Sequence, residues 1–413
     1  MTSAKEISVA IVGAGPVGLA VAALLLANPG RRELRIRIIE PRSLPDWDSS
    51  QVDLRVYALS RASQRILEYL GVWPEIVAAR ASPYRRMHVW QGEYADRLGS
   101  LSFDSAELGE PDLGHIVEDR LIRERLINLL SASDNVELQV GAEVTAVRPG
   151  PRVVEIDTTE GDTFEASLLI AADGGDSTVR QLLELPLRSV SYGQDAVVTH
   201  VETSMPHAET AWQRFLSDGP LAFLPLLDGR SSVVWSMNST DAQRLVAAEN
   251  GDFVTALQRA SGGVLGEVSS AAPRASFPLR AQHASRYSCP RVTLVGDAAH
   301  TVHPLAGQGM NLGLLDAAVL AESLTEALRE GQDPGDLRVL RRYERQRKGS
   351  NLKMLLGMDA LHRLFRVPGP LFGPLRAAGL SAVDRTPFAK TRLMREALGL
   401  QGHLPTVARR RVA

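Results

Sequence analysis

Near the start of the chain, a glycine-rich turn separates a short apolar run from a helical pattern. Ile7–Val12 is apolar and β-branched, which predicts a buried parallel strand, and Pro16–Leu26 has the Ala, Leu and Val content of a buried helix. A second strand is predicted over Leu34–Glu40. This β-α-β order predicts an α/β fold with a parallel sheet.

The turn itself has the spacing G-x-G-x-x-G. Glycines at these positions allow a tight turn, let the backbone approach a pyrophosphate, and let helix and strand pack closely, while the helix N-terminus faces the phosphate charge. An acidic residue at the end of the second strand can bond ribose hydroxyls. Dinucleotide binding is therefore expected at Gly13, Gly15, Pro16, Gly18 and Glu40. A merely glycine-rich turn is the alternative.

Two later apolar runs also end in turns of Gly and Asp. Ser167–Ala172 precedes an Asp-Gly pair, and Arg291–Val295 precedes a Gly-Asp pair. In open α/β sheets, strands pass the chain to ligand-binding loops at such ends. The nucleotide-binding domain is thus predicted to be Rossmann-like and discontinuous, comprising residues 1–80, 101–182 and 285–340.

The segments between these runs are alternating or β-rich, with turn residues between them. They predict an inserted, mostly antiparallel sheet that forms a substrate domain over 81–100 and 183–284. Phe223, Pro225 and Trp235 are expected in a pocket wall that faces the cofactor, although each fits an ordinary core position equally well. Residues 341–413 are predicted to form a helical C-terminal region.

Composition narrows the classes of function. The 46 basic and 48 acidic residues give a formal charge of −2, so no global field favours nucleic acid. Cys289 is the only cysteine, which excludes an intramolecular disulfide and fits a reducing compartment. Glycines interrupt the apolar stretch Val9–Ala27, so it is interpreted as folded structure, and a cytoplasmic location is expected.

The turn after Val295 carries chemistry of its own. Asp297 could accept hydrogen bonds from ribityl hydroxyls, and Gly307 and Gly309 would leave backbone amides free at a helix start near Asn311. Such amides stabilise negative charge on a reduced flavin. A metal site or general base at His300 and His303 is disfavoured, because turn histidines satisfied by backbone are commoner. No metal is expected.

Three motifs in chain order resemble the class A flavoprotein monooxygenases, which share the fold of p-hydroxybenzoate hydroxylase. They are the glycine turn, the A-D-G-G-D-S-T-V-R segment ending at Arg180, and G-D-A-A-H at 296–300. The resemblance covers about residues 7–365. Within that class, H-P-L-A-G-Q-G-M-N-L-G-L-L-D at 303–316 is similar to the signature of ubiquinone-biosynthesis hydroxylases, as are D-L-R-V-Y-A-L-S at 53–60 and Y-E-R-Q-R at 343–347.

The resemblance implies FAD as the bound cofactor and adds residues to its site. Asp173 is expected near the pyrophosphate, and Pro304 and Leu305 are expected to shape the flavin and substrate site. The chain has Glu118-Asp119 before Arg120 where the family more often has Asn, and a surface salt bridge is the alternative for both arginines below. The further expected contacts are Arg55, Arg120, the backbone of Val144, Asp297, Gly307, Gln308, Gly309, Met310 and Asn311.

The resemblance also implies the reaction. A hydroxylase of this family hydroxylates the ring of a polyprenylated phenol or quinol with O2, through a flavin C4a-hydroperoxide, with NAD(P)H as reductant. Hydroxylation of a small soluble aromatic acid or secondary metabolite, and a flavin-binding scaffold in a quinone-biosynthesis complex, stay open as alternatives. Residues 355–380 fit either a peripheral membrane or complex contact or a packed helix pair. Oligomeric state is open.

Overall fold

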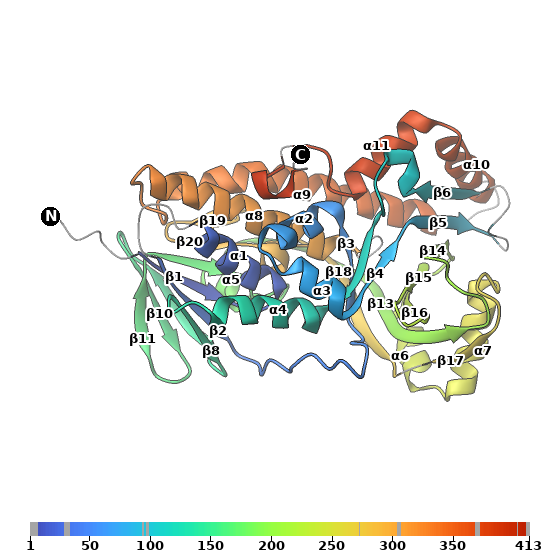
Figure 1. Ribbon diagram of the computed structural model, residues 1–413, viewed down its shortest axis with the longest axis horizontal. Coiled ribbons are helices and arrows are strands. Elements are labelled where there is room, and N and C mark those ends of the chain that lie inside the picture. The colour runs from blue at the N-terminus through green and yellow to red at the C-terminus, as the bar shows by residue number, and fades with distance from the viewer. Residues whose placement is uncertain are drawn as a thin grey trace.

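Two sheets organise the chain, and they lie at opposite ends of the long axis in Figure 1. The computed structural model describes residues 7–28, 34–92, 95, 99–271, 273–303, 307–367, 372–402 and 404–409. The first sheet has six strands in the order β19-β20-β12-β1-β2-β8. These strands are β1 (Ile7–Val12), β2 (Leu34–Glu40), β8 (Val136–Val140), β12 (Leu168–Ala171), β19 (Ser288–Cys289) and β20 (Val292–Leu294).

Strand β1 is central and pairs in parallel with β2 on one side and β12 on the other. The predicted strands over 7–12 and 34–40 are confirmed at both ends. Helices α1, α4 and α8 pack around this sheet, and α8 packs on α9. The helices of this part are α1 (Pro16–Ala27), α2 (Arg61–Tyr69), α3 (Trp73–Arg80), α4 (Asp119–Ser131), α5 (Thr178–Leu182), α8 (Gln308–Arg329) and α9 (Leu337–Arg366).

Glycines allow helices α1 and α8 to pack closely beside the sheet. A Cβ added at Gly18 would lie 2.1 Å from the carbonyl oxygen of Gly13, and one added at Gly313 would lie 2.6 Å from Cγ2 of Val17. Both distances are below any real contact, so these positions require glycine. Two three-stranded sheets flank this core, β3 (Val56–Ser60) with β7 (Gly114–Glu118) and β4 (Ala81–Tyr84), and β9 (Val144–Pro149) with β10 (Val154–Thr158) and β11 (Thr163–Ala166).

The second sheet has nine strands and is mostly antiparallel, as predicted, with one parallel pair between β14 and β5. Helices α6 (Ser239–Ala247) and α7 (Asn250–Ser261) pack against it. Its strands are β5 (Arg86–Gln91), β6 (Ser100–Asp104), β13 (Leu187–Thr203), β14 (Thr210–Phe215), β15 (Pro220–Pro225), β16 (Ser231–Asn238), β17 (Val268–Ala271), β18 (Ala275–Ala284) and β21 (His300–Thr301).

The six-stranded sheet and its helices form the first unit of the fold, and the nine-stranded sheet with α6 and α7 forms the second. Phe223 and Trp235 lie in the core of the second unit. They pack with Phe253 and Leu257 of α7, so for these two side chains the structure supports the alternative of ordinary core residues. Side chains alternate along a strand, which places Pro225 on the same side of β15 as Phe223. The opposite side of the sheet, which includes His200, therefore faces the first unit.

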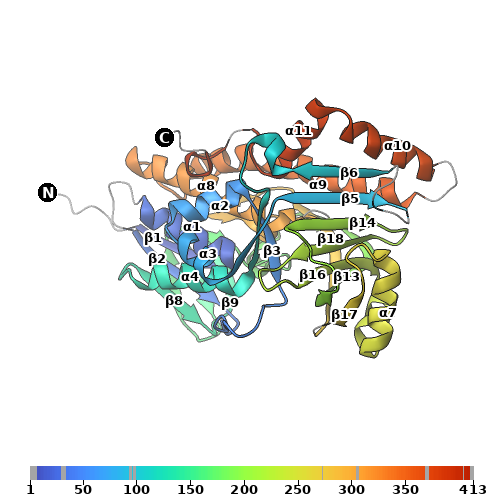
Figure 2. The same cartoon turned by 45° about the vertical axis from the view of Figure 1, so that its right-hand side comes forward.

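The C-terminal helices extend over both units. Helix α9 runs along the top of the molecule in Figure 1 and reaches the strands of the second sheet, as the turned view in Figure 2 shows. Helix α10 (Phe372–Asp384) packs on the edge strand β6, where Ser381 Oγ accepts from the Gly99 amide at 3.2 Å and Asp384 accepts from the Ser102 amide at 3.1 Å. Helix α11 (Pro387–Ala397) follows it.

None of the 13 residues of α10 is fully buried, although the helix is largely apolar. Within the described part of the chain, no helix combines the length and the apolar content needed to cross a bilayer. The side of α10 that faces away from β6 is an exposed apolar surface, which includes Phe372 and Leu375.

Candidate functional site

The glycine turn forms an open cradle at the end of β1. Gly13 has φ +104°, and a Cβ there would lie 2.4 Å from the carbonyl oxygen of Ala172. Gly15 begins α1, no side chain caps that helix, and nothing lies within 4 Å of where a Gly15 Cβ would be. The first amides of α1 are thus free to bind an anion.

Glu40 braces this cradle from the end of β2. Its buried carboxylate accepts hydrogen bonds from the Ala14 amide at 2.9 Å and from the Arg42 amide at 3.1 Å. A carboxylate has about four acceptor positions, so the expected bonds to ribose hydroxyls are compatible with both contacts. Glu40 therefore has a structural contact that the sequence did not predict.

The second motif combines a helix cap with an unsatisfied carboxylate oxygen. Ser177 Oγ accepts from the Arg180 amide at 3.0 Å and caps α5. Asp173 accepts from the Val179 amide at 3.1 Å through one oxygen, while the other is buried without a partner among the described residues. Burial raises the pKa of Asp173, opposed by hydrogen bonds from Ser177 and Val179.

Arg180 fastens the second motif to the third. Its buried guanidinium donates to the carbonyl of Ala298 at 2.8 Å and to that of Gly175 at 2.7 Å. The two turns consequently lie side by side at one end of the parallel sheet. The motif in the sequence includes Arg180, but its contact with Ala298, 118 positions away, could not be predicted from it.

Asp297 lies in a short 3-10 turn and faces the start of α8. A Cβ added at Gly309 would lie 3.9 Å from Asp297 Oδ1, and no hydrogen bond from a described residue reaches this carboxylate. Burial raises its pKa, while the nearby His300 and Arg55 lower it. The carboxylate thus has free acceptor capacity beside the helix start.

Helix α8 begins without a side-chain cap. Gly307 is its N-cap with φ +60°, and the side chain of Asn311 is fully used by the protein. Its amide oxygen accepts from the Ser60 amide at 2.8 Å and from Ser63 Oγ at 2.7 Å, and its amide nitrogen donates to the Ala58 carbonyl at 2.9 Å. Asn311 therefore offers a ligand its backbone only.

The other residues expected around the start of α8 have different outcomes. Gln308 donates to the Ala397 carbonyl at 3.3 Å, and Met310 packs against the main core. Pro304 and Leu305 lie outside the described residues. What α8 presents toward Asp297 is accordingly a row of backbone amides.

Asp316, the last residue of the 303–316 segment, is the buried hub beneath this helix start. Its carboxylate accepts from His300 Nε2 at 2.5 Å and from Arg347 Nε at 2.6 Å. It also accepts from the Gly296 amide at 3.2 Å and from Asn351 Nδ2 at 3.0 Å. Burial alone would raise the pKa of Asp316, but His300 and Arg347 hold it well below its usual range.

His300 Nε2 is therefore bound by a carboxylate, whereas the sequence had suggested contacts with backbone, and Nδ1 has no partner among the described residues. Among the described residues, no group of three or more His, Cys, Asp or Glu side chains is arranged to hold a metal ion. Asp316 was expected only as part of a family signature, and no role was expected for Arg347. Their shared function is to fix the turn that carries Asp297.

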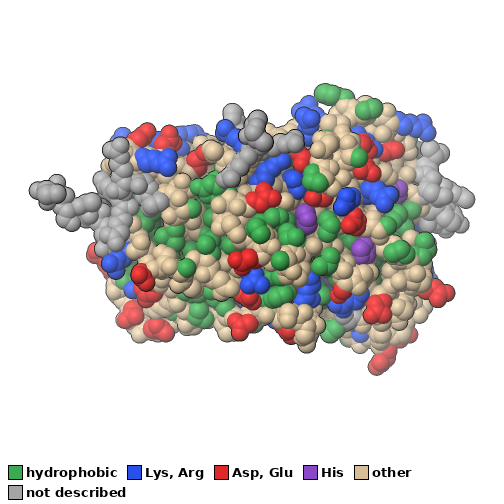
Figure 3. All heavy atoms as spheres, viewed as in Figure 1, with side chains coloured by type: hydrophobic (Ala, Val, Ile, Leu, Met, Phe, Trp, Pro, Cys, Tyr) green, Lys and Arg blue, Asp and Glu red, His purple; other side chains and the backbone are tan. Residues whose placement is uncertain are grey.

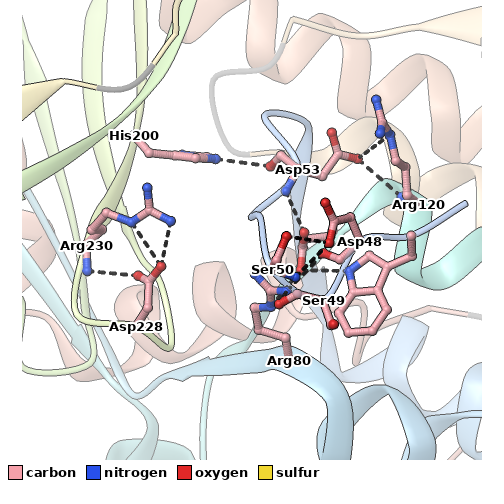
Figure 4. A network of polar contacts seen from close by, with 11 residues as sticks. Asp48, Ser49, Ser50, Asp53, Arg80, Arg120, His200, Asp228 and Arg230 are labelled. Atoms are coloured by element: carbon pink, nitrogen blue, oxygen red, sulfur yellow. Dashed lines mark hydrogen bonds and ion pairs between the residues drawn. The ribbon is translucent and has the colours of Figure 1, made fainter. Parts of the chain in front are cut away.

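The two predicted FAD-binding arginines lie near a contact between the two units. Arg120 Nε lies 3.8 Å from Asp53 Oδ2, so the alternative of a salt bridge is present, although the Arg120 side chain is 42% exposed. His200 of β13 contacts the Asp53 carbonyl at 3.0 Å, and Figure 4 shows Asp53 between His200 and Arg120. The exposed Arg55 lies over the Tyr57 ring, and Val144 is buried at the start of β9.

These residues fit a dinucleotide with a polar, anionic middle part. Two helix starts are uncapped, one oxygen of Asp173 is orphaned, and Asp297 lacks a donor among the described residues. Buried polar groups without partners are rare in folded proteins unless a ligand or water satisfies them. The arrangement can bind phosphates at α1 and hydroxyl groups at Asp297.

Comparison with known proteins points in the same direction. Residues 6–355 match the family model described as an FAD binding domain. A 3-demethoxyubiquinol 3-hydroxylase of Escherichia coli (strain K12) is 37% identical, with 95% of this chain and 98% of the relative covered. Ubiquinone hydroxylase UbiL of Rhodospirillum rubrum is 38% identical, with 96% and 90% covered.

Solved structures share the fold. The p-nitrophenol 4-monooxygenase PnpA from Pseudomonas putida DLL-E4 has a TM-score of 0.76 at 20% identity, covering 95% of this chain and 98% of that one. PqsL, a probable FAD-dependent monooxygenase from Pseudomonas aeruginosa, has a TM-score of 0.74 at 24% identity, with 92% and 100% covered. At these identities the likeness supports the arrangement of two units and no finer property.

Proposed function

Because the chain belongs to the FAD-dependent hydroxylases of ubiquinone biosynthesis, we propose that it hydroxylates the aromatic ring of a polyprenylated phenol or quinol. When bound, FAD supplies the activation of O2, with NAD(P)H as the reductant. The observation that carries the proposal is the free carboxylate of Asp297 beside the uncapped start of α8. The chain's own task is to bind, orient and exclude water.

We assign the cofactor to the first unit. The backbone amides of Gly15, Val17 and Gly18 face the pyrophosphate beside Pro16, which has no N–H to donate. Glu40 faces the ribose, and Asp297 faces the ribityl chain. The amides at the start of α8 face the ring edge that becomes negative on reduction, where the helix dipole stabilises charge. Further contacts are assigned to Gly13, Arg55, Arg120, the backbone of Val144, Asp173, and the backbone of Gly307, Gln308, Gly309, Met310 and Asn311.

We assign the substrate to the side of the second sheet that faces the first unit. We propose that the second unit comprises about 81–100 and 183–284. Its sheet also includes β6, which ends at Asp104, and β21, whereas β4 pairs with β7 beside the first sheet. By alternation along the strands, Ala222, Leu224 and Val234 lie on the side opposite Phe223 and Trp235. Apolar side chains there would exclude water from the reacting ring.

We also propose that the C-terminal helices contact a membrane surface. A prenylated ring partitions into lipid, and the large apolar side chains exposed on α9, α10 and α11 could lie in the interface. Figure 3 shows hydrophobic side chains at the surface over α10 and α11, at the upper right. The large apolar side chains exposed on α9, α10 and α11 include Leu361 (41% exposed), Leu364 (45%), Phe372 (42%), Leu375 (66%) and Phe388 (78%). Arg363 of α9 is also exposed.

Complementation tests the reaction. Cells that lack their own quinone-ring hydroxylase would receive either the wild-type gene or the Asp297→Ala variant, and lipid extracts would be analysed by mass spectrometry. We expect the wild type to remove the under-hydroxylated intermediate and the variant to leave it. An unchanged lipid profile with the wild type would contradict the proposal.

Purified protein separates the alternatives. Oxidation of NAD(P)H stimulated by p-hydroxybenzoate but not by a prenylphenol would favour a soluble aromatic acid as substrate. Retention of FAD with no stimulated oxidation by either compound would favour a scaffold. The same assay identifies the reductant, since NADH and NADPH can be offered separately.

A further inference from the structure

His303 is a buried imidazole without a hydrogen-bond partner in the described part of the chain. The residue is 1% exposed, and neither Nδ1 nor Nε2 contacts a donor or acceptor among the described residues. It lies two residues after β21, between His300, which is held by Asp316, and Gly307, which begins α8. The imidazole thus lies four positions before Gly307, which precedes the helix start to which the flavin ring is assigned.

The neighbours of His303 hold its ring but do not satisfy its nitrogens. The Tyr192 ring meets it edge-on at 4.9 Å between centroids, and the His362 ring lies at 4.6 Å. Both have other polar partners, because Tyr192 donates to Asp359 at 3.2 Å and Arg366 lies 3.4 Å from His362 Nε2. These contacts restrain the ring and give neither nitrogen a hydrogen-bond partner.

An unsatisfied buried donor or acceptor costs roughly 1 to 3 kcal/mol. A site that retains such a group beside the cofactor position is suited to a ligand that restores the bond. We propose that His303 binds the ring hydroxyl of the aromatic substrate by accepting its hydrogen bond. This inference rests on the proposed function, since it requires a phenolic substrate at this place.

The surroundings of His303 keep it an acceptor. Burial, with His362 nearby, lowers the pKa of His303 to about 3, so one ring nitrogen carries a lone pair throughout the neutral range. The groups that face it are Tyr192 from β13 and, from α9, His362, Arg366 and Asp359, the last of which is paired with Arg363. No proton is transferred in this contact, because the hydroxyl keeps its proton while the ring is positioned.

A matched pair of ligands tests the assignment. FAD-loaded protein would be titrated with 2-geranylphenol and with its methyl ether, which cannot donate, while the flavin absorbance is followed. We expect the wild type to bind the phenol about tenfold more tightly, the value of one satisfied buried hydrogen bond. His303→Phe should reduce this preference to less than about twofold with unchanged FAD retention.

Two further variants make the result specific. His303→Gln keeps an acceptor and should retain part of the preference, which guards against a His303→Phe protein that folds poorly. Tyr192→Phe keeps the edge-on ring contact and should retain all of it. Loss of the preference in Tyr192→Phe, or its persistence in His303→Phe, would overturn the assignment.

The outcomes also separate this inference from the proposed function. Equal binding of both ligands by the wild type, together with NAD(P)H oxidation stimulated by the phenol, would reject the role of His303 alone. Binding of neither ligand, with no stimulated oxidation, would reject the proposed function itself.

Discussion

The carboxylate of Asp316 accepts a hydrogen bond from Arg347 Nε at 2.6 Å, and the two side chains are 0% and 7% exposed. This pair joins α8 to α9 directly beneath the turn that carries Asp297. Removing one partner of a buried ion pair leaves an uncompensated charge, which is costly. The pair therefore links the stability of the fold to the geometry of the cofactor site.

Arg347→Met should destabilise the protein by about 3 to 5 kcal/mol, because Asp316 would keep its charge without this partner. Urea unfolding of the FAD-free protein measures the change. Arg345→Met is the matched control on the same helix, since Arg345 is exposed, and it should stay within about 0.5 kcal/mol of the wild type. Equal stability of the two variants would mean that the buried pair contributes little.

Alanine substitutions at two glycines three residues apart should have different effects, one on folding and the other on FAD binding. Gly18→Ala places a Cβ 2.1 Å from the Gly13 carbonyl and should impair folding, whereas a Cβ at Gly15 meets nothing within 4 Å. Gly15→Ala should therefore fold normally yet bind FAD at least about tenfold more weakly, because its methyl group enters the phosphate cradle. Circular dichroism and fluorescence titration of FAD would measure the two effects. Normal FAD affinity in Gly15→Ala would contradict the assignment of the pyrophosphate to this turn.

Asp297→Asn should stabilise the FAD-free protein while it weakens FAD binding. Burial raises the pKa of Asp297, so its ionised form is less favourable in the folded than in the unfolded chain at neutral pH. The amide avoids this cost, and a gain on the order of 1 kcal/mol is expected at pH 7. Because the cost exists only where the unfolded carboxyl is ionised, the gain should disappear below about pH 4.

Urea unfolding at about pH 7 and at about pH 3, roughly three units above and one unit below the ordinary aspartate pKa near 4, would measure this dependence. Asp46→Asn is the control, because Asp46 is exposed, and its effect should be near zero at both values. A gain that persisted in acid would show that the stabilisation has a cause other than the charge of Asp297.

Leu375→Ser together with Phe388→Ser should weaken attachment to vesicles that contain anionic lipid. These side chains are 66% and 78% exposed, and the change removes apolar area that would enter the interface. Co-sedimentation should show at least about a fivefold loss of bound protein. Val77→Ser, an exposed apolar residue on α3, is the control, and an equal loss there would indicate nonspecific adsorption.

The sequence predicted the parts of the fold that local patterns encode. Strands β1 and β2 begin and end where expected, because a buried parallel strand is a continuous apolar run that a turn terminates. The contact among His300, Asp316 and Arg347 could not be predicted in this way, since its members are 16 and 31 positions apart. Only packing of α8 on α9 brings them together.

Alternation along strands set a different limit. The pattern of β15 and β16 shows that each has two sides, but not which side faces the cofactor. Phe223 and Trp235 are large and apolar, so they suited a pocket wall and a core equally well. Helix α7, more than ten residues farther along the chain, decides the matter by covering them.

The contact of α10 with β6 has a practical consequence for shortened versions of this chain. Strand β6 is the last in its sheet, and an uncovered outer strand can pair with a strand of another molecule. Ser381 and Asp384 occupy the amides of Gly99 and Ser102 that would make such a pairing. A protein truncated before Phe372 would expose the unpaired backbone of β6, and it would aggregate through this edge even if the cofactor-binding unit stayed folded.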